Sequence, residues 1–262
     1  MPRTICIGYD PREEEAYRVA YQSARECSNA EVLTIKLDEV REKGLYTRKH
    51  ELRDGRMYDV ISNAPMSTEF AISRFLTPEL ARRHQGPNHQ GERGWAVFMD
   101  CDVLVRKIQA NEANNRKRPT LEALFNIIEQ QPFFAMACVK HEHNPPPGLK
   151  MDGQLQVLYA RKNWSSVMAF NLDHVNNRDL TIKTINKVPG RDLHRFCWLE
   201  GRDDLIYGLD PKWNFLVGHS VYRGIQPHIV HFTEGVPTMP GYENCDYADE
   251  WRAAVAKLRA IV

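Results

Sequence analysis

The chain has 262 residues, of which 42% are hydrophobic and 10% aromatic, enough for a substantial core. Its 35 Lys and Arg residues nearly balance 34 Asp and Glu residues, which excludes a global charge that draws it to nucleic acid or an acidic membrane surface. The six cysteines are scattered without a CxxC pair, and no apolar run approaches the roughly 18 residues of a membrane span. We therefore expect one compact cytoplasmic domain with reduced thiols and no transmembrane segment.

The first elements predict the beginning of an α/β fold. Residues 4–8, TICIG, have the pattern of a buried strand. A helix start follows, in which Asp10 can cap, Pro11 suits the first helical position and Glu13 is placed for a capping box. A second strand is predicted at 31–37, EVLTIKL, from its alternating apolar residues. Strand, short turn, helix and strand are typical of a nucleotide-binding βαβ unit.

Strands and helices continue to alternate after a polar stretch at 38–64. Two short helices are predicted within 67–83, the second capped by Thr77, and the helix at 118–130 is expected to be capped by Thr120. Further strands are predicted at 96–105, 132–139, 164–172 and 227–232, and further helices at 190–209 and 247–262. The alternation predicts the α/β class, and no internal repeat is present.

Two carboxylates, Asp100 and Asp102, interrupt the apolar run AVFMDCDVLV. Residues two apart on a strand face the same side, and open α/β sheets bind ligands at the carboxyl ends of their strands, so both carboxylates could converge on one hard cation. The alternative is a solvated turn in which the aspartates cap the next segment, and this stretch alone leaves the two interpretations equal. His228 and His231 are candidate further ligands, although a lone histidine is more often a core or surface residue.

Six segments together resemble the landmarks of a known family. In chain order they are ICIGYD, EFAISRFLTPEL, VFMDCDVLV, KNWSSVMAFN, GRDDLIYGLDPKWN and HIVHFTEGVP. They are similar to family 8-like GT-A glycosyltransferases, which include glycogenin and the bacterial lipooligosaccharide galactosyltransferases, with small phage-type and proteobacterial members closest. The resemblance implies a GT-A fold with one Rossmann-like mixed sheet flanked by helices. It implies one domain over 1–262, with a nucleotide-sugar-binding half at 1–105 and an acceptor and catalytic half at 106–262.

The resemblance also implies a metal site. Family members hold Mn²⁺ or Mg²⁺ against the diphosphate of a nucleotide sugar with the DxD motif and a histidine near the C-terminus. Carried over, these ligands are Asp100, Asp102 and His231. The chemistry agrees, because a departing nucleoside diphosphate develops negative charge that a divalent ion stabilises, and carboxylate and imidazole ligands are compatible with Mn²⁺.

Other matches imply donor contacts in the N-terminal half. Gly8, Tyr9 and Asp10 match the segment that cradles the base and ribose; the alternative is that Tyr9 packs and Asp10 only caps a helix. Arg74 matches the arginine that faces the diphosphate and the first aspartate. Its planar fork suits phosphate oxygens, although a helix arginine is by default a solvated residue.

Matches in the C-terminal half imply a sugar pocket. Ser165 and Ser166 match a stretch that lines the donor sugar, and ordinary strand-end hydrogen bonding is the alternative. Asp203 and Asp204 match the acidic or amide residue beneath the reacting sugar carbon, with Asp204 preferred; the alternative is that one of them caps a helix. Gly235 matches the glycine of the turn after the metal-binding histidine.

One departure from the family pattern concerns the diphosphate. The family commonly has a lysine and a tryptophan after the terminal histidine and glycine, and the lysine touches the diphosphate. Here Val236 and Pro237 follow. Lys140, Arg12 or Arg223 could supply that charge, or the donor is held differently.

The resemblance implies a metal-dependent glycosyltransferase that moves a sugar, from a UDP-sugar, to a hydroxyl acceptor with retention of configuration. No residue has the pattern of a general base, so we expect the leaving phosphate to take the acceptor proton. The default acceptor is a glycan or lipid-linked saccharide. A hydroxymethylated base in duplex DNA is a second possibility, for which basic clusters at 82–83, 106–107 and 116–118 could follow phosphates, although charge runs are usually solvated surface.

Two other function classes remain open at the level of sequence. A metal-dependent nucleotidyltransferase or phosphohydrolase also places paired carboxylates at strand ends, but it predicts a second metal and usually a glycine-rich loop, and neither GxGxxG nor GxxxxGK occurs. A non-catalytic sugar-nucleotide-binding module would keep the roles of Tyr9 and Arg74 without turnover.

Overall fold

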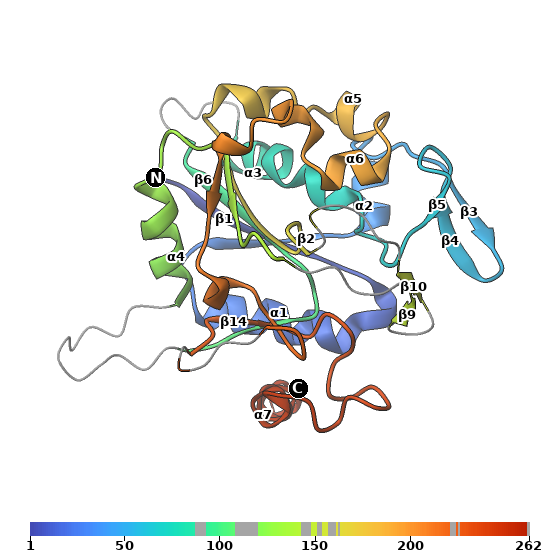
Figure 1. Cartoon of the computed structure of the whole chain (residues 1–262), viewed down its shortest axis with the longest axis vertical. Helices are drawn as coiled ribbons and strands as arrows, with labels where there is room; N and C mark the ends of the chain where they lie inside the picture. Colours follow the sequence, from blue (N-terminus) through green and yellow to red (C-terminus); the bar gives the residue numbers. More distant parts are fainter. Residues whose placement is uncertain are drawn as a thin grey trace.

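The core of the fold is a six-stranded mixed sheet, seen in a computed structural model (Figure 1). The structure describes residues 1–86, 93–107, 120–142, 148–150, 154–156, 161, 163–220, 224 and 226–260. The strands, in their order across the sheet, are β12 (Ile206–Gly208), β8 (Met136–Cys138), β11 (Val167–Asn171), β6 (Trp95–Met99), β1 (Arg3–Gly8) and β2 (Glu31–Ile35). All neighbours pair in parallel except β11, which runs antiparallel to both β6 and β8. The predicted mixed α/β sheet is confirmed.

A smaller sheet begins where the large one ends. It holds β13 (Phe215–Leu216), β14 (Ile229–His231) and β7 (Val103–Val105). Only residues 100–102 separate β6 from β7, so the strand predicted at 96–105 is split between two sheets. The backbone N–H of Asp100 still donates to Ser166, beside the large sheet, whereas the Asp102 carbonyl accepts from Phe232, beside the small one. The two aspartates therefore lie at the junction of the sheets.

Helices cover both faces of the large sheet. Figure 1 shows α3, α5 and α6 on one side of it and α1 on the other, with α7 beyond α1. Their bounds are α1 (Glu14–Glu26), α2 (Leu37–Glu42), α3 (Thr77–Gln85), α4 (Thr120–Glu129), α5 (Ile182–Ile185), α6 (Gly190–His194) and α7 (Ala248–Arg259). Short 3₁₀ helices are η1 (Pro11–Glu13), η2 (Ser73–Leu76), η4 (Val175–Arg178), η5 (Cys197–Leu199), η6 (Asp203–Leu205) and η7 (Pro211–Trp213).

Some local predictions are confirmed and others are wrong. Asp10 caps η1 and accepts from the backbone N–H of Arg12 at 2.9 Å, as predicted. Thr77 is not the N-cap of α3: η2 runs directly into that helix, so Leu76 takes the cap position and the Thr77 hydroxyl donates to the Arg74 carbonyl. The helix predicted over 190–209 forms only at its start, as α6. Left-handed backbone at Phe196 and Glu200 breaks it into short turns, and its end forms β12.

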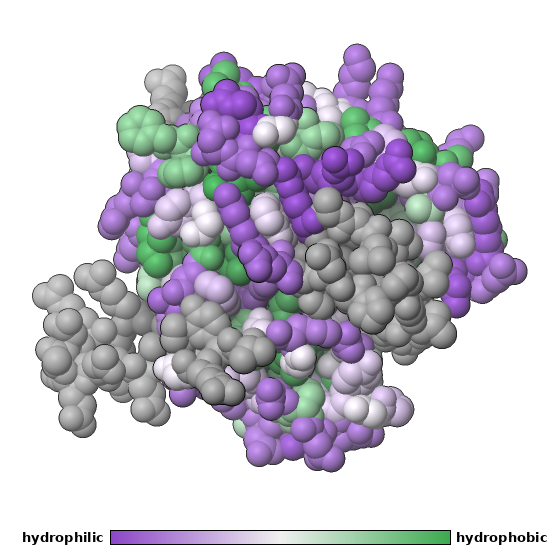
Figure 2. Space-filling view, viewed as in Figure 1, coloured by the Kyte–Doolittle hydropathy of each residue, from purple (hydrophilic) through white to green (hydrophobic). Residues whose placement is uncertain are grey.

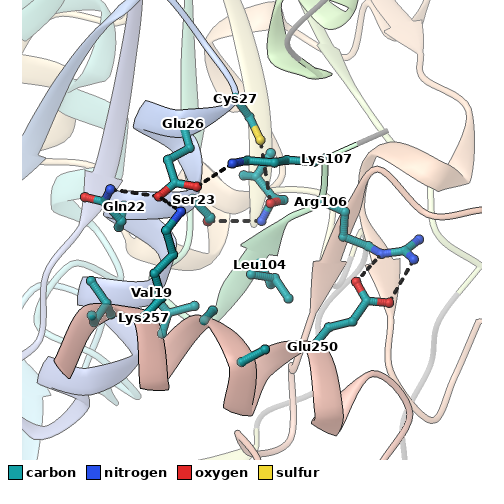
Figure 3. Close-up of a pocket in the computed structure, with 14 residues that line it drawn as sticks. Val19, Gln22, Ser23, Glu26, Cys27, Leu104, Arg106, Lys107, Glu250 and Lys257 are labelled. Atoms are coloured by element: carbon teal, nitrogen blue, oxygen red, sulfur yellow. Dashed lines mark hydrogen bonds and ion pairs between the residues drawn. The ribbon is translucent and has the colours of Figure 1, made fainter. Parts of the chain in front are cut away.

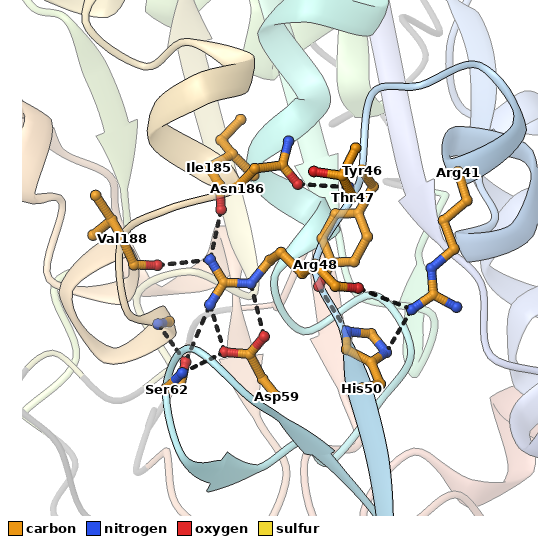
Figure 4. A network of polar contacts seen from close by, with 11 residues as sticks. Arg41, Tyr46, Thr47, Arg48, His50, Asp59, Ser62, Ile185, Asn186 and Val188 are labelled. Atoms are coloured by element: carbon orange, nitrogen blue, oxygen red, sulfur yellow. Dashed lines mark hydrogen bonds and ion pairs between the residues drawn. The ribbon is translucent and has the colours of Figure 1, made fainter.

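The stretch 38–64, predicted only as polar, contains α2 and most of a third sheet. That sheet holds β3 (His50–Arg53), β4 (Arg56–Asp59) and β5 (Ala64–Pro65). Arg48 anchors it to the body (Figure 4): its Nε donates to Asp59 at 2.8 Å, and its Nη1 donates to the carbonyls of Ile185 and Val188, both at 2.7 Å. The Arg48 and Asp59 side chains are fully buried, so the charges depend on each other for compensation. A fourth sheet pairs β9 (Gly148–Lys150) with β10 (Gln154–Gln156).

One face of the molecule is predominantly polar. Hydrophilic residues cover most of the coloured area in Figure 2, and apolar residues appear there in separate groups. Among the described residues, no helix combines the length and hydropathy needed to cross a membrane.

Candidate functional site

The predicted metal ligands meet at the junction of the two sheets. Asp100 and Asp102 follow β6, and His231 ends β14, whose antiparallel pairing places it opposite Val103 of β7. One ligand atom from each of the three side chains lies within 4.8 Å of the other two. Asp100 and His231 are 131 positions apart along the chain. They are brought together because β14 pairs with β7, the strand that follows the aspartates.

The donor set of this group fits a divalent cation. The exposed fractions of the side chains are 15% for Asp100, 6% for Asp102 and 2% for His231, and His231 Nε2 lies 3.3 Å from Asp102 Oδ1. Two carboxylates in so buried a place repel each other and require positive charge nearby. Carboxylate oxygens together with one imidazole nitrogen are ligands that suit Mn²⁺.

Arg74 supplies part of that positive charge. Its Nη1 lies 2.7 Å from Asp100 Oδ1 and donates to the Ser165 carbonyl at 2.8 Å. The guanidinium also lies over the rings of Phe70 and Phe98, at 5.2 and 5.0 Å from their centroids. Only 6% of Arg74 is exposed, so it is not the solvated helix residue of the alternative interpretation. Its position beside the first aspartate is the one that the resemblance implies.

Hydrogen bonds connect the two serines to this group. Ser165 Oγ is 2.7 Å from Nδ1 of His194 on α6. Ser166 Oγ accepts from Nδ2 of Asn214 at 2.9 Å, and Asn214 Oδ1 lies 3.0 Å from His231 Nδ1. Both serines are 2% exposed. The sequence interpretation missed His194 and Asn214; Asn214 is the last residue of the matched segment GRDDLIYGLDPKWN, and no charge or spacing singles it out.

The N-terminal candidates lie at the same edge of the sheet, because β1 runs parallel to β6. The Asp10 carboxylate is fully buried and accepts from the Arg12 side chain, the Arg12 backbone and the Glu69 backbone. Burial raises the pKa of Asp10, but these hydrogen bonds outweigh it and the net pKa is lowered. Capping and ion pairing therefore occupy this carboxylate. A side chain at Gly8 would overlap the Phe70 ring, whose nearest atoms would lie 2.4 Å from a Cβ.

Tyr9 is half-buried and remains partly open to a ligand. Its ring meets Tyr17 edge-on at 4.9 Å, and the Lys36 ammonium lies 5.0 Å from its centroid. A hydrogen bond to Glu14, followed by burial, raises the pKa of Tyr9 to about 12, so the phenol is neutral under ordinary conditions.

The structure does not bring Asp203 and Asp204 into the metal group. Both belong to η6, which precedes β12, and neither is among the three side chains of that group. Their side chains are 57% and 62% exposed and form ion pairs with Arg161 and Arg202, respectively.

Gly235 and the basic residues that are candidates to contact the diphosphate lie in different environments. Gly235 is buried, and a Cβ there would lie 2.4 Å from the Tyr242 ring, so packing alone requires glycine. Arg12 is engaged with Asp10 and the Ser67 carbonyl. Lys140 is exposed and follows β8, which runs in the same direction as β6, so it lies at the metal edge. Arg223 lies outside the described residues.

A cavity of about 310 Å³ lies elsewhere, between α1, β7 and α7 (Figure 3). The Glu26 carboxylate in its wall is held by Lys107 at 2.8 Å, by Lys257 and by Gln22. Burial raises the pKa of Glu26, but these three contacts lower it to about 2. The lining includes none of the predicted site residues, so this cavity is separate from the metal group.

The described basic clusters are already paired. Arg83, Arg106 and Lys107 form ion pairs with Glu79, Glu250 and Glu26, respectively. Arg82 donates to the Leu172 carbonyl. The cluster at 116–118 lies outside the described residues. These pairings leave no observation that favours a duplex DNA acceptor.

Comparison with protein-family models gives no match. Protein CDI of Arabidopsis thaliana is 36% identical over 256 residues, which are 95% of this chain and 85% of that protein. The bifunctional glycosyltransferase WbbM superposes with a TM-score of 0.54 and 14% identity, covering 97% of this chain but only 50% of WbbM, so the chain spans half of that protein. An active-site mutant of LgtC superposes with a TM-score of 0.50 and 11% identity over 97% of this chain and 95% of LgtC. These likenesses confirm the predicted GT-A glycosyltransferase fold.

Proposed function

The chain belongs to the family of Protein CDI of Arabidopsis thaliana, and from this membership and its GT-A fold we propose that it is a metal-dependent glycosyltransferase. It transfers a sugar from a nucleotide-sugar donor, a UDP-sugar, to a hydroxyl group of a glycan acceptor with retention of configuration. The observation that carries the proposal is the convergence of Asp100, Asp102 and His231 beside Arg74 at the carboxyl end of β6.

The proposed roles follow from the position of each side chain. Asp100, Asp102 and His231 hold Mn²⁺ or Mg²⁺, which when bound stabilises negative charge on the departing diphosphate. Arg74 orients Asp100 and adds a fixed positive charge in a water-poor place, where it acts strongly. We assign the outer diphosphate contact to Lys140, in place of the lysine that the family carries after its terminal glycine.

The chemical step needs no protein base in this proposal. The bond from the anomeric carbon to the diphosphate oxygen breaks, the bond to the acceptor oxygen forms on the same face, and the leaving phosphate oxygen takes the acceptor proton. The protein contributes by positioning both substrates and stabilising the leaving group. Because Asp203 and Asp204 lie outside the metal group and pair with Arg161 and Arg202, respectively, we assign no step to them.

The alternatives receive less support from the described residues. A two-metal nucleotidyltransferase or phosphohydrolase needs a second cluster of ligands, and the described part of the chain holds only one group of this kind. For location, we propose a reducing compartment such as the cytoplasm, because all six cysteines are free thiols.

The decisive experiment measures thermal stability and then turnover. UDP-, GDP- and ADP-sugars are tested with and without Mn²⁺, and a UDP-sugar with Mn²⁺ should raise the melting temperature because a ligand that binds only the folded state stabilises it. Release of UDP should then require Mn²⁺ and be abolished in Asp102→Asn but not in Asp204→Asn. If no nucleotide sugar raises the melting temperature with metal present, the proposal is wrong.

A further inference from the structure

Asn214 is a buried amide whose orientation can be deduced from its neighbours. Its Nδ2 lies 3.3 Å from the Asn163 carbonyl, which can only accept, and 2.9 Å from Ser166 Oγ. The Ser166 hydroxyl donates its own hydrogen to the same carbonyl at 2.7 Å, so towards Asn214 it accepts. Two acceptors on one side require the NH₂ group there. The amide oxygen must therefore face His231.

This orientation determines which nitrogen of His231 carries hydrogen. Asn214 Oδ1 is an acceptor only and lies 3.0 Å from His231 Nδ1, so Nδ1 must donate. In the neutral imidazole the lone pair is then on Nε2, the atom that lies 3.3 Å from Asp102 Oδ1. With the other tautomer, Nε2 would present a hydrogen to a cation instead of a lone pair.

We propose that Asn214 is a positioning residue that fixes His231 as the Nδ1–H tautomer and thereby sets the affinity of the group for a divalent cation; its metal-binding part rests on the proposed function. Ser166 is part of the same hydrogen-bond network. It holds the Asn214 amide from the end of the large sheet, while His231 comes from the small sheet. In this assignment Ser166 acts through Asn214 and does not contact the donor sugar.

The first experiment measures Mn²⁺ affinity in the full chain by calorimetric titration. Asn214→Ala should weaken binding by roughly 10- to 100-fold, the usual effect of losing a hydrogen-bond partner of a ligating histidine. Ser166→Ala should weaken it less, because the Asn163 carbonyl still orients the amide.

Asn177→Ala is the matched control. Asn177 is as fully buried as Asn214, and its Nδ2 likewise donates to two acceptors, the carbonyls of Ala135 and Asn171. It lies at the opposite end of the sheet, because Asn171 pairs with Trp95, the first residue of β6. This variant should lose stability without losing Mn²⁺ affinity in its folded fraction. Equal affinities of wild type and Asn214→Ala would overturn the inference.

A second experiment reads the tautomer directly and needs no metal. Nitrogen-15 NMR of the histidine rings, with His231 assigned by its absence in His231→Gln, should show Nδ1 protonated and Nε2 bare in the neutral wild-type imidazole. Asn214→Ala should give a mixture of tautomers. Protonated Nε2 in wild type would overturn the inference even if the variant does not fold. Failure to bind Mn²⁺ with the expected tautomer would instead refute the metal site and leave the role of Asn214 in place.

Discussion

Arg74 and Asp100 form a buried ion pair whose two members depend on each other. Replacing Arg74 with Met leaves the Asp100 carboxylate without its cation, so we expect a loss of about 3–5 kcal/mol in the free energy of unfolding measured in urea. Arg83→Met, in an exposed helical pair with Glu79, should change it by about 0.5 kcal/mol or less. Added Mn²⁺ should restore part of the stability lost in Arg74→Met. An equal effect of the two substitutions would contradict this account.

Gly8 lies against the Phe70 ring and has no room for a methyl group. Gly8→Ala should cost about 1–3 kcal/mol of unfolding free energy, because the ring must shift. At Gly208, also in a strand of the large sheet, a Cβ would be 3.8 Å from its nearest neighbour, so Gly208→Ala should be much milder. In the double variant that combines Gly8→Ala with Phe70→Leu, the loss of unfolding free energy should be smaller than the sum of the losses in the two single variants. Strict additivity, measured in urea, would show that the ring is not the obstacle.

At the level of residues, the sequence was informative where charge is out of place. Asp100 and Asp102 could be found because carboxylates rarely interrupt an apolar strand, and His231 and Arg74 through the motif resemblance; the structure brings all four together. Asn214 carries no charge and acts only through another side chain, so its role appears only once strands distant in sequence are placed.

At the level of elements, strands with buried apolar runs were predictable and interrupted helices were not. The strands at 4–8 and 31–37 appear nearly as expected. The region 190–209 has helical composition, but left-handed backbone at Phe196 and Glu200 interrupts it, and a propensity pattern does not contain these interruptions. The division of 96–105 between two sheets likewise depends on β14, which lies far away in sequence.

His50 makes the β3–β4–β5 sheet sensitive to mild acid. Burial and then the Arg41 charge lower the pKa of His50 to about 4, whereas in the unfolded chain it is about 6.5. The unfolded state therefore takes up the proton first, and stability should fall as the pH drops from about 6.5 to about 4. Urea unfolding across this range should show a smaller fall in His50→Gln.

A second histidine contributes in the same pH range. The pKa of His228 is also lowered to about 4, chiefly by burial, so part of the slope should remain in His50→Gln. An unchanged slope in His50→Gln would mean that the proton is taken up elsewhere.

Glu26 connects parts of the molecule that are remote in sequence, because it pairs with Lys107 after β7 and with Lys257 on α7. Its pKa is lowered to about 2 from the ordinary value of 4.5. Such a carboxylate stabilises the fold above its unfolded pKa, and that contribution disappears as the pH falls from about 4.5 towards about 2. The Glu26→Gln variant should therefore have a lower free energy of unfolding than wild type at neutral pH. That free energy should also fall less than in wild type over this acid range. Parallel acid curves for both proteins would contradict the prediction.

The junction at residues 100–102 has a mechanical consequence for the whole molecule. The small sheet consists of three strands of two or three residues each, so few hydrogen bonds hold it to itself. A cation bound by ligands from both sheets would act as a cross-link. The free energy needed to separate β14 from the large sheet would then rise with the logarithm of the ion concentration. Amide hydrogens of Val103–Val105 and Ile229–His231 would then exchange with solvent more slowly as Mn²⁺ is added, and the rigidity of this edge would follow the supply of metal.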